Sequence, residues 1–293
     1  MIKVRNLSRT YADGTEALRD ITLDIPAGAI VGLVGRNGAG KTTLLKCLMG
    51  LLNPSRGAVR IFGHDLRFAP AAIREQVTYV SQMQRLPEER RLVDLWELYG
   101  PLYSAWDRAF AEHAAELFEI HPESYIGGLS GGQQRLAALT LAFAARPKLL
   151  LLDEPAAGLD PIARRRLLSA LATLIAEQEG LSVILSTHLL ADLERLADTL
   201  IFLEEGQLSR VTTMDDLRRR YRRLQIIFGT EGIPPGFRVP GTLRRDESGP
   251  VLTVLVEDID DFYLDTLKSR PEMRVIEHPL SLEDLFIELE EAR

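Results

Sequence analysis

One stretch near the start of the chain restricts the possible folds more than any other. A short apolar run at 29–34 leads into a glycine-rich segment at 35–42 that fits the pattern G-x-x-x-x-G-K-[ST], and helical apolar spacing then continues to Gly50. A strand, a glycine loop and a helix N-terminus together direct backbone N–H groups and the partial positive charge of the helix at an anion. The stretch therefore predicts a phosphate-binding loop, against the alternative of a glycine-rich structural turn.

Two side chains of this loop have expected roles. Lys41 is placed to reach the β- and γ-phosphates of a nucleotide, and the hydroxyl of Thr42 is placed to ligate Mg²⁺. The motif alone specifies neither the nucleotide nor whether it is hydrolysed. The residues expected to contact it are Gly35, Asn37, Gly38, Ala39, Gly40, Lys41, Thr42 and Thr43.

Composition excludes several classes of protein. The net charge of -7 gives no argument for nucleic-acid binding. Cys47 is the only cysteine, which rules out an internal disulfide and a multi-cysteine metal site. No targeting signal opens the chain, and the most apolar segment, 136–152, is interrupted by charged residues and a proline. We expect a cytoplasmic protein whose membrane role comes through a partner.

Short apolar runs alternate with helical spacing over most of the chain. Buried strands are predicted at 149–152 and 182–187, and a helix is predicted over 133–145, just before the first of them. This alternation is typical of a mostly parallel sheet that is covered on both faces. Residues 1–28 are predicted to be rich in β-strand, and 92–117 to form a helical insertion.

The character of the chain changes beyond about residue 211. We predict a first domain over 1–212 and a small accessory α/β domain over 213–293, whose last helix is capped by Ser281. The accessory domain contains a cluster of arginines at 218–223. A solvated helix face is one interpretation of the cluster, and attraction to anionic lipid headgroups or to a partner is the other.

An acid pair and a histidine follow two of the predicted strands. Asp153 suits the binding of Mg²⁺ and Glu154 suits the activation of water, although two solvated acids at a strand end are the simpler alternative. His188 follows the 182–187 strand at the carboxyl edge, where ligands of open α/β sheets bind. It is either a γ-phosphate contact or a structural histidine. Gln82 also follows a strand, and its amide oxygen is a candidate metal ligand.

A second glycine turn lies about ninety residues after the first. Ser130, Gly131 and Gly132 precede the predicted helix that begins at Gln133, so this turn too is expected to bind an anion. A helix cap explains Ser130 but does not explain two successive glycines.

Together these motifs resemble the ATP-binding subunit of an ABC (ATP-binding cassette) transporter over about residues 1–210. The segments 35–42 and 153–154 match the Walker A and Walker B motifs, 129–133 spells the family signature Leu-Ser-Gly-Gly-Gln, and 158–160 is similar to the D-loop. Many members have alanine where this D-loop has Gly158. The resemblance assigns the following positions: Tyr11 as the adenine-stacking aromatic, Gln82 as the Q-loop glutamine, Asp160 as the D-loop aspartate and His188 as the switch histidine.

The resemblance implies a fold and partners. The fold is a P-loop NTPase of the ABC type, with a mostly parallel core sheet, an antiparallel β subdomain, a helical subdomain at about 84–145 and the C-terminal α/β appendage. Two ATP-binding subunits, in a homodimer or a heterodimer, pack head to tail and enclose ATP and Mg²⁺, so that Ser130, Gly131 and Gly132 of one close over the γ-phosphate held by the other's Lys41. The pair is peripheral on the inner face of the cell membrane through integral membrane permease subunits.

The appendage and the segment 103–107 are similar to ATPase subunits of bacterial ABC-2 type exporters, which favours export of an unidentified substrate. Two alternatives belong to other classes of protein. One is a soluble ABC-type switch acting on ribosomes or DNA, against which stand the single cassette and the absence of sustained heptads. The other is a regulatory module with an inert cassette, against which stands the joint presence of Lys41, Asp153, Glu154 and His188.

Overall fold

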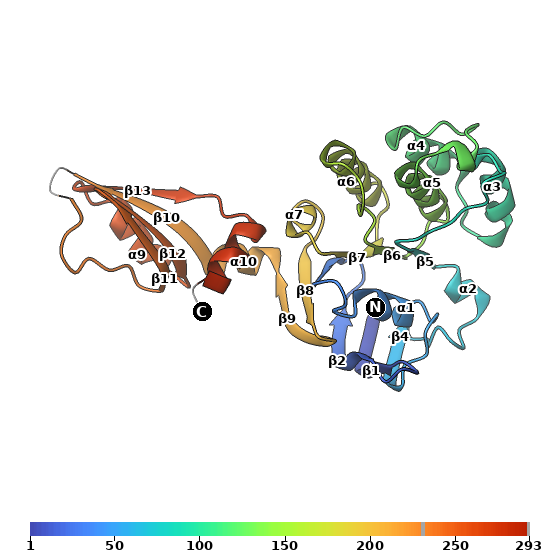
Figure 1. The fold of residues 1–293 in the computed structure, drawn as a ribbon, viewed down its shortest axis with the longest axis horizontal. Helices are drawn as coiled ribbons and strands as arrows, with labels where there is room; N and C mark the ends of the chain where they lie inside the picture. Colours follow the sequence, from blue (N-terminus) through green and yellow to red (C-terminus); the bar gives the residue numbers. More distant parts are fainter. Residues whose placement is uncertain (230–231, 292–293) are drawn as a thin grey trace. The chain divides into compact units, whose positions relative to one another are not determined.

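The computed structural model describes residues 1–229 and 232–291, and Figure 1 shows their ribbon. The chain forms two compact units: the first is Met1–Val211 and the second begins at Thr212. Each unit has its own sheets and its own buried core. Within these residues, no helix is long and apolar enough to cross a membrane.

A six-stranded sheet with the order β5-β6-β7-β3-β8-β9 forms the middle of the first unit. Neighbouring strands from β5 to β8 run parallel. Every residue of β6 and β7 is buried, as in strands covered on both faces, and the predicted parallel sheet is confirmed. The strands are β3 (Ile30–Val34), β5 (Val77–Val80), β6 (Leu149–Asp153), β7 (Ser182–Thr187), β8 (Thr199–Glu204) and β9 (Gln207–Thr213).

The first unit also contains a three-stranded antiparallel sheet, with the order β2-β1-β4. Ile2 pairs with Ile25 on one side and with Ile61 on the other, and all three join Leu45 of α1 and Leu151 of β6 in one buried cluster. Burying such a side chain contributes about 1.5–3 kcal/mol. This core holds α1, and with it the loop before α1, against β6. The strands are β1 (Ile2–Thr10), β2 (Glu16–Ile25) and β4 (Arg56–Ile61).

Helices cover both faces of the parallel sheet. Figure 1 shows α1 and the antiparallel sheet on one side and α5 and α6 on the other. The predicted helical insertion consists of α3 and α4, which pack on α5: the buried indole Nε1 of Trp96 donates to Thr140 Oγ1 at 3.0 Å. The helices are α1 (Lys41–Leu48), α2 (Ala71–Arg74), α3 (Leu92–Tyr99), η1 (Gly100–Leu102), α4 (Arg108–Leu117), η2 (Ile126–Gly128), α5 (Gly131–Ala144), α6 (Pro161–Ala176) and α7 (Leu190–Leu193).

The second unit is built on a four-stranded antiparallel sheet with the order β11-β12-β10-β13. Alternate residues of β10 and β12 form its core with α9. Ser281 Oγ accepts from Asp284 N at 3.1 Å, which confirms the predicted cap of the last helix. The elements are α8 (Met214–Arg220), β10 (Tyr221–Phe228), β11 (Thr242–Ser248), β12 (Val251–Glu257), α9 (Asp261–Lys268), β13 (Met273–His278) and α10 (Leu282–Glu291).

The prediction of one helix face for the arginine cluster 218–223 is wrong beyond Arg220. The helix ends there and Tyr221 begins β10, in which Leu224, Ile226 and Phe228 alternate as buried residues of a strand. The basic run hides this period of two in the sequence. Strands β8, β9, β10 and β11 were not predicted.

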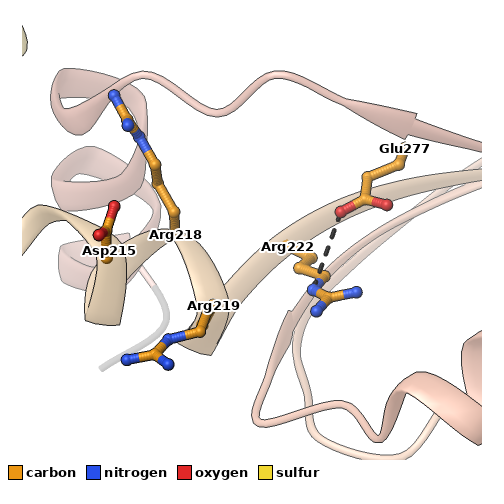
Figure 2. A pocket seen from close by; sticks show the side chains of 5 residues that line it. All are labelled: Asp215, Arg218, Arg219, Arg222 and Glu277. Carbon is orange, nitrogen blue, oxygen red and sulfur yellow. Dashed lines mark ion pairs between the residues drawn. The ribbon is translucent and has the colours of Figure 1, made fainter.

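Most of these arginines are ion-paired inside the second unit. Arg222 lies 2.7 Å from Asp261 and 3.8 Å from Glu277, and Figure 2 shows it facing Glu277 while Arg218 and Arg219 extend in different directions from α8. A cavity of about 440 Å³ is lined by Asp215, Arg218, Arg219, Arg222 and Glu277. Arg219, Arg220 and Arg223 also have carboxylate partners. The structure thus favours a network of ion pairs, and lipid attraction stays a prediction.

Candidate active site

The first glycine loop connects β3 to α1. At the N-cap of α1, Gly40 has φ 102°, and a Cβ there would lie 2.5 Å from the backbone oxygen of Ala17, so only glycine fits. No side chain caps α1, which leaves its first N–H groups for a ligand. The buried Lys41 side chain folds over the loop, and its Nζ donates to Gly35 O at 2.7 Å and to Arg36 O at 3.3 Å. A buried cation and an uncapped helix N-terminus form an anion site within one chain.

Asp153 ends β6 and is held by three hydroxyl groups. Its Oδ1 accepts from Ser186 Oγ at 2.7 Å and from Thr42 Oγ1 at 3.1 Å, and its Oδ2 accepts from Tyr79 Oη at 3.1 Å. Burial, together with the charge of Asp153, raises the pKa of the Tyr79 phenol, which therefore stays a donor. Asp153 is only 1% exposed, yet in the described part of the chain it has no Lys, Arg or His partner.

A carboxylate this deeply buried is costly without a positive charge beside it. The cluster at Asp153 consists of oxygen donors, which hard divalent cations such as Mg²⁺ prefer. The described residues contain no group of three His, Cys, Asp or Glu side chains that could hold a metal ion alone. The donor set therefore fits a cation whose remaining ligands come from phosphate and water.

Glu154 lies between a lysine and a histidine. Its Oε1 is 3.3 Å from Lys41 Nζ and accepts no hydrogen bond from the described residues, and its Oε2 is 2.9 Å from Nδ1 of His188. The backbone of Glu154 is in the left-handed region with φ 48°, and its N–H donates to Ser186 Oγ at 3.0 Å. Because the side chain of Glu154 is 9% exposed and that of His188 is 41% exposed, the carboxylate faces inward and the imidazole reaches solvent.

Two other predicted residues have different surroundings. Tyr11 Oη lies 3.1 Å from Thr43 Oγ1, beside α1, and the guanidinium of Arg9 is 5.1 Å from the centre of the Tyr11 ring. Gln82 is exposed, and its side chain makes no hydrogen bond to the described residues. Its backbone oxygen accepts from Arg135 of α5 at 3.1 Å. The structure places Tyr11 near the phosphate loop and does not bring the Gln82 amide to Asp153.

The second glycine loop is organised around the start of α5. Ser130 Oγ accepts from Gln133 N at 3.3 Å, and Gln133 Oε1 accepts from Ser130 N at 2.9 Å, which forms a capping box. A Cβ on Gly132 would lie 2.5 Å from Cδ2 of Leu159, whereas one on Gly131 would meet nothing within 4 Å. No described hydrogen bond or ion pair joins this loop to Lys41.

The D-loop, 158–160, leads directly into α6. Asp160 is the N-cap of α6 and accepts from Ile162 N at 2.9 Å and from Ala163 N at 3.0 Å. These backbone hydrogen bonds hold the pKa of the Asp160 carboxyl below its usual range. Asp160 is therefore a helix cap in this chain, in addition to any role toward a second subunit.

Sequence reasoning missed three residues of this region. Tyr79 and Ser186 belong to no motif and come to Asp153 through strand register. Arg135 donates from α5 to Gln82 O and to the backbone oxygens of Pro155 and Ala157. These hydrogen bonds tie α5 to the loop after β5 and to the loop after β6. Burial of Arg135 lowers the pKa of its guanidinium. The available signal was an arginine in the helical run that follows the second glycine loop.

Comparison with known proteins decides the family. A family model described as ABC transporter matches residues 18–157. The ABC transporter ATP-binding protein YtrB of Bacillus subtilis (strain 168) is 30% identical over 98% of this chain and 97% of its own length. This chain belongs to the ABC transporter ATP-binding proteins. It is an ATPase, and ATP is its nucleotide.

Other relatives of this ABC protein are similar over different lengths. Nod factor export ATP-binding protein I of Rhizobium sp. (strain N33) is 29% identical over 98% of this chain and 96% of its own length. Daunorubicin/doxorubicin resistance ATP-binding protein DrrA of Streptomyces peucetius is 33% identical over 74% of this chain and 66% of its own length. The first of these matches includes the second unit as well as the cassette.

Solved structures confirm the cassette fold. An ATP-binding subunit of an ABC transporter superposes with a TM-score of 0.65 at 33% identity, over 75% of this chain and 92% of that chain. A dimer of the ATP-binding cassette MJ0796 in a post-hydrolysis state with ADP and Pi gives 0.66 at 26% identity, over 73% of this chain and 99% of that one. The predicted P-loop NTPase of ABC type is confirmed.

Proposed function

We propose that this ATPase powers the export of a substrate through separately encoded membrane permease subunits, and that it lies on the inner face of the membrane because it binds them. Two relatives support the direction by their names, which describe Nod factor export and resistance to daunorubicin and doxorubicin. The assignment of residues 213–293 to an accessory domain belongs to the same proposal.

Mg²⁺ is the metal we assign to this site. Thr42, Asp153 and Gln82 would hold it, because hydroxyl, carboxylate and amide oxygens are its preferred protein ligands. When bound, Mg²⁺ neutralises charge on the phosphates and polarises the phosphoryl group. Of these three residues, Thr42 and Asp153 are already in contact, at 3.1 Å.

Hydrolysis is assigned to three residues that meet at Glu154. Lys41 holds the β- and γ-phosphates with its buried ammonium. Glu154 is the general base: within the described part of the chain its Oε1 accepts no hydrogen bond, so it is available to take the proton of the attacking water. His188 orients this carboxylate through Nδ1 at 2.9 Å and contacts the γ-phosphate from its exposed side. The Lys41–Glu154–His188 arrangement is the observation that carries the proposal.

The remaining site residues bind nucleotide. Tyr11 stacks on the adenine, and the loop backbone surrounds the phosphates. Ser130, Gly131, Gly132 and Gln133 act on the ATP of a second subunit, which fits a loop that makes no described contact with its own Lys41. Asp160 approaches the same interface. The loop residues in contact with nucleotide are Gly35, Asn37, Gly38, Ala39, Gly40, Thr42 and Thr43.

A head-to-tail pair of ATP-binding subunits, homodimeric or heterodimeric, would complete each site from both members. Closure would then depend on ATP, because hydrolysis removes the phosphate that both loops grip and biases the pair towards its open state. The solved structures of the MJ0796 cassette described as dimeric support a paired state for cassettes of this fold.

The experiment that tests the proposal uses the Glu154→Gln variant of the full chain with Mg-ATP. Without the base, ATP stays intact, and we expect a stable dimer by size-exclusion chromatography with light scattering. The double variant Lys41→Ala, Glu154→Gln is the matched control and should stay monomeric, because it cannot hold the phosphates. A Glu154→Gln chain that remains monomeric at every concentration, alone, with its permease and with any cassette encoded beside it, would overturn the paired mechanism. Retention of the wild-type chain by membranes that contain a permease encoded beside it, and by no others, tests the membrane partner.

A further inference from the structure

The two oxygens of the Asp153 carboxylate are held unequally. Oδ1 accepts from both Ser186 and Thr42, at 2.7 and 3.1 Å. Within the described chain, Tyr79 is the only donor to Oδ2, at 3.1 Å. A carboxylate that accepts hydrogen bonds at both oxygens is oriented more firmly than one that is held at a single oxygen. The Tyr79 hydroxyl is therefore the contact that holds the second oxygen of the Asp153 carboxylate.

The strand register explains how Tyr79 reaches this position. In the parallel pairing of β5 with β6, Tyr79 lies opposite Leu151, and Asp153 is two residues further along β6. Residues two apart point to the same face of a sheet, so Tyr79 and Asp153 share a face. On the other side of β6, Ser186 of β7 pairs directly with Asp153. The carboxylate is thus held from both neighbouring strands.

The hydroxyl of Tyr79 has no other described partner, and a phenylalanine ring would occupy the same half-buried space. Packing alone therefore does not require a tyrosine here. Groups that hydrogen-bond to a metal-binding carboxylate orient it, and their loss typically weakens metal binding by about 10–100-fold. Tyr79 also lies three residues before Gln82, so the end of one strand carries a contact to Asp153 and a proposed metal ligand.

We propose that Tyr79 is a positioning residue that orients the Asp153 carboxylate for the divalent cation of the ATPase site. The proposal rests on the metal-binding role assigned to Asp153 above. Tyr79 touches neither nucleotide nor metal in this assignment. It acts on the cation through one hydrogen bond to Oδ2, and the ring serves only to bring the hydroxyl there.

The test compares Tyr79→Phe with the wild-type chain. Mn²⁺, which is visible by electron paramagnetic resonance, replaces Mg²⁺, and its affinity is measured in the presence of a slowly hydrolysed ATP analogue. We expect Mn²⁺ affinity to fall by about 10-fold, while affinity for the analogue in EDTA is unchanged. In hydrolysis assays the half-saturating Mg²⁺ concentration should rise by a similar factor, with kcat recovered at high Mg²⁺.

Two further variants make the result specific. Tyr103→Phe is the matched control: it removes a phenol that makes no described hydrogen bond, and it should leave every measurement unchanged. Asp153→Asn should weaken Mn²⁺ binding more than Tyr79→Phe does. Unchanged Mn²⁺ affinity in Asp153→Asn would overturn the metal site itself, whereas an effect in Asp153→Asn with none in Tyr79→Phe would overturn only the role of Tyr79.

Other outcomes of the Tyr79→Phe measurement also count against the proposal. If affinity for the analogue in EDTA falls as much as Mn²⁺ affinity, the hydroxyl supports the nucleotide site as a whole and does not act on the metal. If Tyr79→Phe fails to fold, judged by circular dichroism and thermal unfolding of the metal-free chain, the hydroxyl is needed for the fold and its role is structural.

Discussion

The two glycine loops of the first unit both precede a helix, but they leave the helix N-termini in different states. In the first loop, 35–42, Gly40 is the N-cap of α1, and no described side chain caps this helix. The second loop, 129–133, places Ser130 at the N-cap of α5, where Gln133 completes a capping box. The first N-terminus is therefore open to a ligand, while the second has part of its hydrogen bonding satisfied by its own chain.

The charges around the two loops differ as well. The buried Lys41 side chain folds over the first loop and lies 3.3 Å from Glu154, so this loop has a cation and the proposed base within reach. In the second loop Ser130 and Gly131 are exposed, and space is open beside Gly131. The difference teaches that a helix N-terminus alone does not make a complete phosphate site. The first loop is equipped to bind ATP by itself, and the second is suited to contact a phosphate that another molecule presents.

The largest expected effect is on kcat in a variant that still binds ATP at the first loop. Glu154→Gln should lower kcat at least ~10²-fold, because it removes the general base, while ATP affinity is retained through Lys41 and the loop backbone. Phosphate release and nucleotide binding measure the two separately. Glu177→Gln, an exposed acid paired with His113, is the control and should leave both unchanged. Unchanged turnover in Glu154→Gln would show that another group activates the water.

Mixing two defective chains tests whether the loops act on the same ATP from different subunits. Lys41→Ala disables the first loop. Gly131→Asp disables the second: the aspartate fits in open space at the start of α5, but it repels the partner's phosphate, and like charges in contact cost several kcal/mol. We expect each variant alone to lose ATPase activity by about 10²-fold, and the mixture to recover activity, because one of its two sites is intact.

Gly128→Asp is the matched control for the added charge, since it lies before the helix start and also meets open space. It should retain most of the activity. A mixture that is as inactive as its components, although the two chains associate, would contradict a shared site between identical subunits. Recovery only when a different cassette is added would favour a heterodimer.

Single alanines should separate the structural requirements of the two loops. Gly40→Ala combines φ 102° with a Cβ at 2.5 Å from Ala17 O, and should lower the free energy of unfolding by about 1–3 kcal/mol or more. At Gly131 the backbone is not left-handed and an added Cβ meets open space. Gly131→Ala should therefore leave the free energy of unfolding unchanged or raise it by up to about 1 kcal/mol. Urea unfolding without nucleotide measures both. Equal destabilisation would remove this distinction between the loops.

The smallest effect concerns a third helix N-terminus, which carries a charged cap. The pKa of Asp160 is lowered in the folded chain by backbone hydrogen bonds from Ala163 and Ile162. Its contribution to stability is therefore fully present above the unfolded pKa of about 3.9 and is lost as the pH falls through the lower folded value. Asp160→Asn keeps a cap that does not titrate.

Between pH 5 and pH 3, thermal unfolding should show a slightly larger loss of Tm in the wild-type chain than in Asp160→Asn. The other carboxylates contribute equally to both and cancel in the difference. Parallel curves over this range would mean that the hydrogen bonds to Asp160 are not maintained in solution.

Local patterns predicted much of this molecule. The phosphate loop, the acid pair after β6 and the histidine after β7 are short motifs at the ends of apolar strands, and parallel strands bring such ends to one edge of a sheet. The contacts of Lys41 and His188 with Glu154 agree with that expectation.

The features that the sequence did not predict depend on strand register or are hidden by charged residues within a strand. Tyr79 and Ser186 are ordinary strand residues, and their contacts with Asp153 follow only from how β5, β6 and β7 align. In the second unit, arginines at 222 and 223 occupy β10 because their charges are paired with acids from α9, β13 and α10. Single-strand alternation cannot reveal partners that lie more than 30 residues away in the sequence.

The left-handed backbone conformation of Glu154 limits which substitutions at this position can remove ATPase activity without damaging the fold. β-branched residues are strained at φ 48°, so valine, isoleucine or threonine at this position would damage the turn after β6 as well as the chemistry. Glutamine, asparagine and glycine tolerate the conformation or add little strain. Relatives that have lost ATPase activity but keep the cassette fold should therefore have one of these three residues at the equivalent position. A β-branched residue there would indicate that the backbone of the turn has a different conformation.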